Sequence, residues 1–132
     1  MKQASLFLKA ILEHNQTVTQ VVGSRIYPIA APAGVDTFPF VTFDHSSVPD
    51  IGTKDGDVRI ITADVTFVSR TAIEAEELSD SFLPAMYSFY EDETNNTFVN
   101  DFYEPEFVSE SEIYIQDIDA FAVNMKIKFE TK

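Results

Sequence analysis

A stretch near the end of the chain, residues 121 to 130, alternates apolar with small or polar side chains: FAVNMKIKFE. Successive side chains of a β-strand point to opposite faces, so this alternation predicts a strand with one buried face. A second stretch, residues 58 to 69, alternates in the same way. Its expected buried set is Ile61, Ala63, Val65 and Phe67, with Thr62, Asp64 and Thr66 on the other face. Two long strands of this kind indicate a sheet that is covered on one side.

Three further segments complete the expected sheet. Residues 40 to 48 form a strand that leads through turn-forming residues 49 to 57 (PDIGTKDGD) into the strand at 58 to 69. These two strands form a β-hairpin whose tip is longer than a minimal two-residue turn. A further strand is expected within residues 107 to 115, and Ile26-Tyr27-Pro28 forms a short extended piece.

Two helices are expected to cover the sheet. Residues 3 to 14 have apolar side chains at helical spacing and predict an amphipathic helix, and a short helical turn is expected at residues 19 to 22. Thr71, with Glu74 three residues later, is a capping box that starts a second long helix. Pro84 lies within this helix and predicts a kink. The expected buried stripe of the second helix is Ala75, Leu78, Phe82, Met86 and Phe89.

The order helix, strands, helix, strands favours an α+β fold, because the elements do not alternate strictly. We predict a mainly antiparallel sheet of about four or five strands with a long β-hairpin, packed against an N-terminal helix and a central helix. The 132 residues are expected to form a single domain, 1-132. Lys9 and Glu13 interrupt the first apolar run, and no run approaches the ~20 residues of a membrane span. We therefore expect neither a cleaved signal nor a membrane-spanning helix.

The net charge of −13 is unevenly distributed along the chain. Residues 1 to 70 hold seven acidic and six basic side chains, whereas the stretch between Arg70 and Lys126 holds fourteen acidic and no basic ones. No basic patch is visible, so binding to nucleic-acid phosphates is disfavoured. Two interpretations stay open: a solvated acidic surface that aids solubility, or an acidic face toward a basic partner or toward DNA that must not adhere.

Side chains that could perform chemistry are scattered. The chain has no Cys and two His. His45 follows Asp44 on an expected strand, so their side chains point to opposite faces and form no dyad; His14 ends a helix, where it suits the helix dipole. The KDGD segment at 54 to 57 lacks the spacing of a calcium loop, and no phosphate-binding loop or serine elbow is present. We expect no catalytic, metal-binding or cofactor-binding residue and no enzymatic activity.

Residues 22 to 43, VGSRIYPIAAPAGVDTFPFVTF, follow the first helix. This segment resembles the signature of the phage tail-completion or tail-terminator family, small proteins that close a tail tube and join it to the head. The resemblance runs from about residue 4 to residue 79. Its pieces are, in order, Gly23, Arg25, Ile26, Tyr27 and Pro28; Pro32 and Gly34; Pro39, Phe40 and Val41; the strand ADVTFVS at 63 to 69; and the helix at 72 to 79.

The resemblance implies an α+β subunit of a ring, typically a hexamer, stacked on the last ring of a tail tube. It implies no catalysis and no cofactor. The implied partners are further copies of the chain, the major tail tube protein and the head–tail connector protein. DNA would pass through the ring without specific binding, and no membrane is involved. The implied location is the head-proximal end of the tail in the virion, after synthesis in the host cytoplasm.

Two other hypotheses come from different classes of protein. An acidic DNA mimic could inhibit a nucleic-acid-binding protein, although a mimic would spread its acids along its length and residues 1 to 70 are nearly neutral. A small ligand-binding domain is the third, and no constellation of polar residues supports it.

For the ring hypothesis, the candidate subunit-interface or channel residues fall into two sets. They are Asp50, Lys54, Asp55 and Asp57 in the hairpin tip, and Arg25, Arg59 and Arg70 elsewhere. The tip is expected to project from the sheet, because its residues are polar and turn-forming. The basic members are expected to meet the acids of residues 91 to 119 on a neighbouring subunit. Reversing Arg59 or Arg70 to Glu is expected to weaken ring formation and to change stability little.

Overall fold

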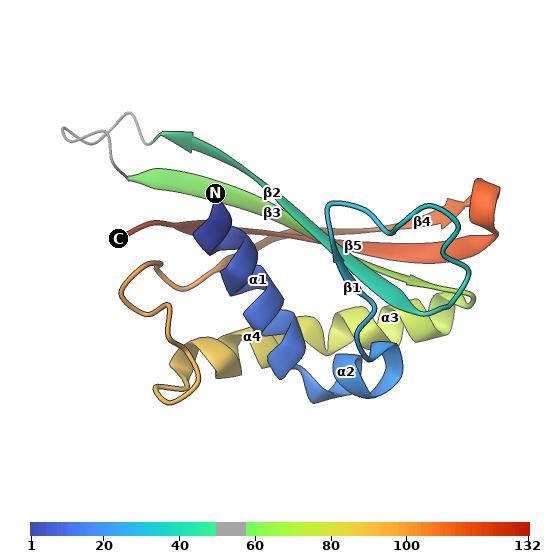
Figure 1. Ribbon diagram of the computed structural model, residues 1–132, viewed down its shortest axis with the longest axis horizontal. Coiled ribbons are helices and arrows are strands. Elements are labelled where there is room, and N and C mark those ends of the chain that lie inside the picture. The colour runs from blue at the N-terminus through green and yellow to red at the C-terminus, as the bar shows by residue number, and fades with distance from the viewer. Residues whose placement is uncertain (50–57) are drawn as a thin grey trace.

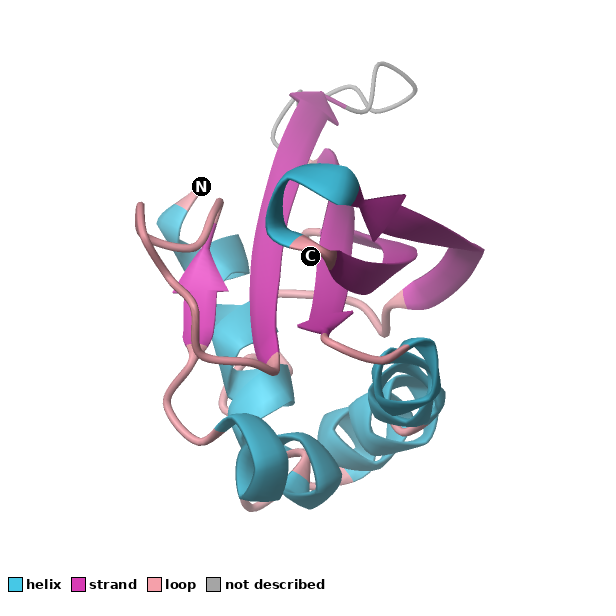
Figure 2. Cartoon of the chain, turned by 90° about the vertical axis from the view of Figure 1, so that its right-hand side faces the viewer, coloured by secondary structure: helices cyan, strands magenta, loops and turns pink. Residues whose placement is uncertain are grey.

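Within residues 1 to 49 and 58 to 132, which the computed structural model describes, five strands form one sheet and helices cover one of its faces (Figures 1 and 2). The strands are β1 (Ile26–Pro28), β2 (Phe40–Pro49), β3 (Arg59–Ser69), β4 (Glu106–Ile115) and β5 (Ala120–Glu130). The helices are α1 (Lys2–His14), α2 (Gln16–Val22), α3 (Ala72–Asp80), α4 (Phe82–Glu91) and the short 3-10 helix η1 (Gln116–Ile118).

The strand order across the sheet is β1-β2-β3-β5-β4. β1 runs parallel to β2, and the other neighbouring pairs are antiparallel. β2 and β3 form the predicted hairpin pair, in register from Phe40 opposite Val68 to Pro49 opposite Arg59. The predicted tip of this hairpin, with Asp50, Lys54, Asp55 and Asp57, lies outside the described residues. The prediction of a mainly antiparallel α+β fold is confirmed.

The central strands β3 and β5 alternate between a buried and a more polar face, as their sequences predict. The four residues expected on the inner face of β3 are each 0% exposed. On β5, Val123, Met125, Ile127 and Phe129 are buried on the same side of the sheet. On the outer face Asn124 Nδ2 donates to Thr66 Oγ1 at 2.9 Å. The alternation therefore reports a sheet with helices on one face only.

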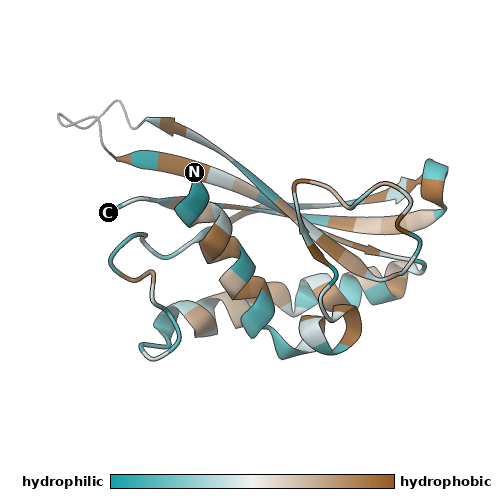
Figure 3. Cartoon of the chain, viewed as in Figure 1, coloured by the Kyte–Doolittle hydropathy of each residue, from teal (hydrophilic) through white to brown (hydrophobic). Residues whose placement is uncertain are grey.

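The helix layer is held to the sheet by large aromatic side chains. Phe7 of α1 is fully buried. Its ring stacks on Phe102 at 5.0 Å between centroids and meets the edge of Phe129 on β5 at 5.3 Å. In Figure 3 the helices carry both apolar and polar residues, which is the pattern of helices with one buried face. α1 and α2 lie at the β1–β2 end of the sheet, and α3 packs on β3 and β5.

The junction between α1 and α2 is fixed by one buried asparagine. Asn15 Oδ1 accepts a hydrogen bond from Val18 N at 3.2 Å and so caps α2, which begins three residues earlier than the sequence pattern predicts. Its amide Nδ2 donates to Ser81 Oγ at 3.1 Å. Ser81 lies between α3 and α4, so this side chain ties the α1–α2 junction to the α3–α4 junction.

The second helix is divided at Ser81 into α3 and α4, instead of being bent at Pro84. Pro84 occupies the third position of α4, where no intrahelical donor is required. Its ring would clash with the carbonyl four residues earlier in a continuous helix, that of Asp80, which is the last residue of α3. The proline therefore acts one turn before its own position.

Half of the predicted capping box is present at the start of α3. Thr71 Oγ1 accepts from Glu74 N at 3.2 Å, as expected. Glu74 Oε1, however, accepts from Ser69 Oγ, and Ser69 Oγ accepts from Thr71 N at 3.4 Å. The carboxylate thus reaches the Thr71 backbone through the buried Ser69 hydroxyl, which joins the end of β3 to the helix start.

Candidate interaction surface

β4 is the edge strand of the sheet and has no strand beyond it. All of its residues are exposed except the last, Ile115, which is half-buried. Large apolar side chains are among them: Phe107 is 43% exposed, Ile113 55% and Tyr114 51%. A long exposed edge with apolar side chains is a site where another chain can pack, and folded proteins normally protect or cover it.

The register with β5 shows which β4 side chains face the helix layer. Directly opposed residues share a face, and Glu110 lies opposite Met125, Glu112 opposite Val123, and Tyr114 opposite Phe121. A register irregularity between Phe107 and Ser109 brings Phe107 to this face as well, opposite Ile127. Phe107, Glu110, Glu112 and Tyr114 therefore form the helix-side face of β4, while Ser109, Ser111 and Ile113 belong to the other face.

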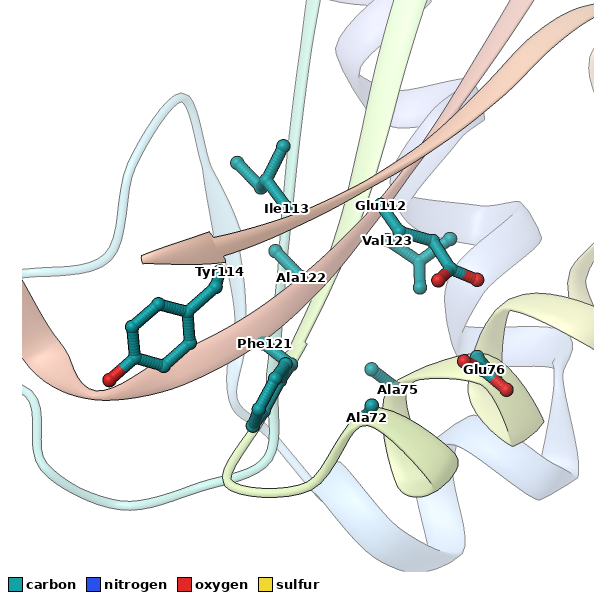
Figure 4. A pocket seen from close by; sticks show the side chains of 9 residues that line it. All are labelled: Ala72, Ala75, Glu76, Glu112, Ile113, Tyr114, Phe121, Ala122 and Val123. Atoms are coloured by element: carbon teal, nitrogen blue, oxygen red, sulfur yellow. The ribbon is translucent and has the colours of Figure 1, made fainter. Parts of the chain in front are cut away.

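A cavity of about 260 Å³ lies between this face and α3. Figure 4 shows its floor and walls: Ala72 and Ala75 of α3 lie across from Val123 of β5, with Tyr114 and Phe121 at one end and Glu76 and Glu112 at the other. The small alanine side chains leave the space. The site is therefore an apolar hollow with two carboxylates at one end.

A second cavity of about 420 Å³ continues along the same strand toward α4. It is lined by Ser79, Asp80, Leu83, Pro84, Phe107, Glu110 and Met125. The two cavities lie one after the other between β4 and the α3–α4 pair, and we call them together the β4 groove. Its rim carries four acidic side chains, Glu76, Asp80, Glu110 and Glu112.

In the described part of the chain, none of the four rim acids of the β4 groove forms an ion pair. Between Arg70 and Lys126 the sequence contains no Lys or Arg. Among the described residues, the ion pairs of β4 are limited to Glu106 with Lys128 at 4.0 Å, on the other face of the sheet. The rim acids thus concentrate negative potential over an apolar floor, which attracts a basic amphipathic surface.

Two of the predicted interface arginines, Arg25 and Arg70, contact the same short segment of the chain. Arg25 Nε donates to the carbonyl of Pro39 at 2.9 Å, and its NH2 group donates to the carbonyl of Val21 at 2.9 Å. The Arg70 guanidinium lies 4.1 Å from the centre of the Phe38 ring. Both side chains therefore contact the end of the proline-rich segment, just before β2 begins.

Arg70 also links this segment to the turn between β4 and β5. It donates to the carbonyls of Ile118 at 2.7 Å and Asp119 at 3.1 Å. Asp119 has a left-handed backbone, with φ 48°, and its Oδ1 accepts from Tyr114. This turn lacks the glycine that usually occupies such a position, and the sequence pattern therefore left its boundaries undefined.

Arg59 does not join the other two arginines. It begins β3, whereas Arg70 follows the last residue of that strand, so the two lie at opposite ends of the sheet. Arg59 is exposed, and its backbone N–H donates to Thr131 Oγ1 at 2.9 Å. The structure thus separates the predicted basic set into a pair at one end of β3 and a single residue at the other.

The two histidines have partners within the helix layer. His45 Nε2 lies 3.0 Å from Ser5 Oγ of α1, and burial lowers the pKa of its imidazole. Asp44 lies on the opposite face of β2, as predicted, directly across from Asp64 of β3. Burial, and then the charge of Asp64, raise the pKa of the Asp44 carboxyl. His14 packs its ring on Phe89 at 5.2 Å between centroids.

The described residues contain no cluster of three His, Asp or Glu side chains placed to hold a metal ion. In the same part of the chain, no helix is long and apolar enough to span a bilayer.

The β4 groove was not predicted from the sequence, although a signal for it was present in the sequence of β4. The segment EFVSESEIYI mixes apolar and acidic residues on both faces, which is unusual for a strand with a buried face.

No family model matches the chain, and no curated protein matches it either. Among solved structures, the fold is similar to that of a chain in a structure described as the "Virion of native gene transfer agent (GTA) particle". The TM-score is 0.72 at 11% sequence identity, over 94% of this chain and 90% of that chain. At this level of identity the similarity shows a shared fold, and it extends over almost the whole of both chains.

Proposed function

We propose that this protein is a structural component of a phage or phage-like virion that closes the tail tube and joins the tail to the head. It acts as a ring, with six copies as the expected number, around a central channel for DNA. The observation that carries the proposal is the fold similarity to a virion chain, which spans 94% of this chain. The residues of the tail-terminator signature in segment 22 to 43 support the same assignment.

The positions of the signature residues agree with a structural role in this proposal. Arg25 and Arg70 both hold the end of the proline-rich segment against β2. A segment fixed in this way offers a rigid irregular surface to a neighbour at low entropic cost. The partners in the proposal are other copies of the chain, the major tail tube protein and the head–tail connector protein. No catalytic step and no cofactor are part of it.

The test is disruption of the gene in the phage or prophage that carries it. We expect filled heads without tails, together with tails that are not closed at a uniform length, in electron micrographs. A plasmid copy of the gene restores complete particles. Immunogold labelling of complete particles is expected at the head-proximal end of the tail. Normal infectious particles from the disrupted strain would contradict the proposal.

The proposal also predicts how the protein meets DNA. An acidic channel lining repels phosphates and lets the duplex slide, whereas a basic lining would hold it through counterion release. The stretch from residue 71 to residue 125, which lacks Lys and Arg, is the proposed source of part of the lining. We expect no measurable duplex binding at physiological salt and no nuclease activity with divalent metals. Micromolar or tighter duplex binding at that salt would contradict the acidic channel.

A further inference from the structure

We infer that the β4 groove receives the exposed face of α1 from a second copy of this chain, in a head-to-tail contact. This inference rests on the proposed ring and names the two surfaces that would form its subunit interface. The helix face consists of Lys2, Leu6 and Lys9, spaced four and three residues apart on one side of α1. The groove and this helix face lie at opposite ends of the sheet.

The first reason is that the helix layer is narrower than the sheet. α1 and α2 pack at the β1–β2 end, and α3 packs on β3 and β5. Among the described helices none packs closely on β4: α3 and α4 face its helix-side residues across the two cavities of the β4 groove. Figure 2 shows these helices on the same side of the sheet. One additional helix next to α3 would complete the layer. The small side chain of Ala72, which is half-buried, leaves room for its close approach.

The second reason is charge. The groove rim carries Glu76, Asp80, Glu110 and Glu112 over an apolar floor. The face of α1 has the complementary pattern: Leu6, which is 41% exposed, lies between two lysines. Lys9 is 3.6 Å from Glu13, but both side chains of that pair are more than half exposed, so the pair is weak and Lys9 can be shared.

The third reason concerns symmetry. Antiparallel pairing of two β4 edges in the register that opposes Glu110 of one copy to Glu112 of the other would set like charges against each other, and like charges on an edge strand oppose such pairing. A contact between two different surfaces is free of this repulsion. Such head-to-tail contacts repeat from copy to copy and close into a ring when the rotation allows.

The chain has no cysteine, so disulfide cross-linking can test the contact directly. We would mix Leu6→Cys protein with a size-tagged Glu112→Cys protein, oxidise, and measure the mixed dimer on a non-reducing gel. The matched control replaces Glu112→Cys with Ser111→Cys, because Ser111 is the adjacent exposed residue on the other face of β4. We expect at least tenfold faster cross-linking at position 112. The Ser111→Cys control keeps all four rim acids and therefore attracts the lysines of α1 more strongly than Glu112→Cys does. Faster cross-linking at position 112 would thus reflect the geometry of the contact and not its charge.

A second measurement exchanges the charges without cysteine. Glu110→Lys with Glu112→Lys is expected to abolish self-association in sedimentation, and mixing with Lys2→Glu/Lys9→Glu protein is expected to restore it. Added salt weakens the contact, since screening acts on exposed pairs. All of the changed side chains are exposed, so circular dichroism should show unchanged folding.

Several results would overturn the inference. Equal cross-linking at positions 111 and 112 would show that the groove face is not the contact. Absence of any cross-link, together with a monomer at every concentration, would show that a second copy does not fill the groove. If the protein is such a monomer and reversing the charge of its groove nevertheless prevents incorporation into particles, a basic segment of another virion protein is the occupant. A failure of the proposed function itself would be recognised separately, because gene disruption would then leave normal particles.

Discussion

β3 and β4 are strands of similar length that share β5 as a neighbour, yet they differ in almost every other respect. β3 has strands on both sides and helices on one face, and its inner residues are fully buried. β4 has a strand on one side only, faces α3 and α4 across the cavities of the β4 groove, and is exposed along nearly its whole length. Both strands pair with β5 in the antiparallel direction. The comparison therefore separates the side chains that stabilise the subunit from those that are available for contact with another chain.

The largest expected effect removes an aromatic ring from the covered part. Phe7→Ala is expected to lower the free energy of unfolding by about 3–5 kcal/mol, because it leaves a cavity among Phe102, Phe129 and their neighbours. Phe107→Ala makes the same change on β4 and should cost less than about 1 kcal/mol, since this ring is 43% exposed. Urea denaturation of both variants measures the difference. Equal losses would mean that β4 is covered in the isolated subunit.

A smaller loss of stability is expected from a change at Asn15, between α1 and α2. Asn15→Ala removes the cap of α2 and the hydrogen bond to Ser81. We expect a loss of about 1–2 kcal/mol, because a buried polar network loses its central member. Asn100→Ala, at an exposed asparagine in the loop after α4, is the control and should change little. A loss at Asn15 no larger than the control would show that α1 and α4 hold the layer alone.

Arg70 connects the covered and uncovered regions, and the structure changes what charge reversal there should do. Arg70→Glu is expected to cost about 1 kcal/mol, since it removes two hydrogen bonds to the β4–β5 turn and the contact with Phe38. Amide hydrogen exchange should increase at residues 116 to 119. Arg59→Glu is the comparison, since its charge lies at the far end of β3. Unchanged exchange in the turn would contradict this role.

The smallest effect concerns the open face of the sheet. Burial and the nearby Asp64 raise the pKa of Asp44 above 3.8, so its contribution to stability is present below that pH and is lost as the pH rises through the folded-state pKa. Asp44→Asn should therefore stabilise the subunit at pH 7 by at most about 0.5 kcal/mol, because solvent screens this exposed group. At pH 3 the variant and the parent should be equal. A stabilisation that persists at pH 3 would point to another cause.

The strand pattern predicted the covered part of the fold well. Alternation in β3 and β5 identified their buried faces residue by residue, and the Thr71 cap marked the start of α3. The helix boundary at Ser81 was harder to predict from the sequence, because Pro84 acts on the carbonyl of Asp80 one turn earlier. The α2 cap was missed because Asn15 also suits the end of α1, where its side chain could serve either helix.

The candidate site could not be predicted in the same way. Arg25, Arg59 and Arg70 were grouped by charge, but two of them contact the proline-rich segment and the third lies at the far end of β3. The β4 groove brings together residues of α3, α4, β4 and β5 that are up to about fifty positions apart in sequence. No local spacing links Glu76 to Glu112, so only the pairing of β4 with β5 places them on one rim.

By itself the sequence determined which residues form the inner face of the sheet and that the second half of the chain is acidic. Removal of apolar side chains from water is favourable, so a strand that is covered on one face carries apolar residues at alternate positions. This alternation lies within a single strand and can be read directly from the sequence. The tertiary structure alone decided that β4 lies at the edge of the sheet, with a groove between it and the helix layer. Strand order depends on pairings between distant segments, and it is this order that exposes the β4 groove.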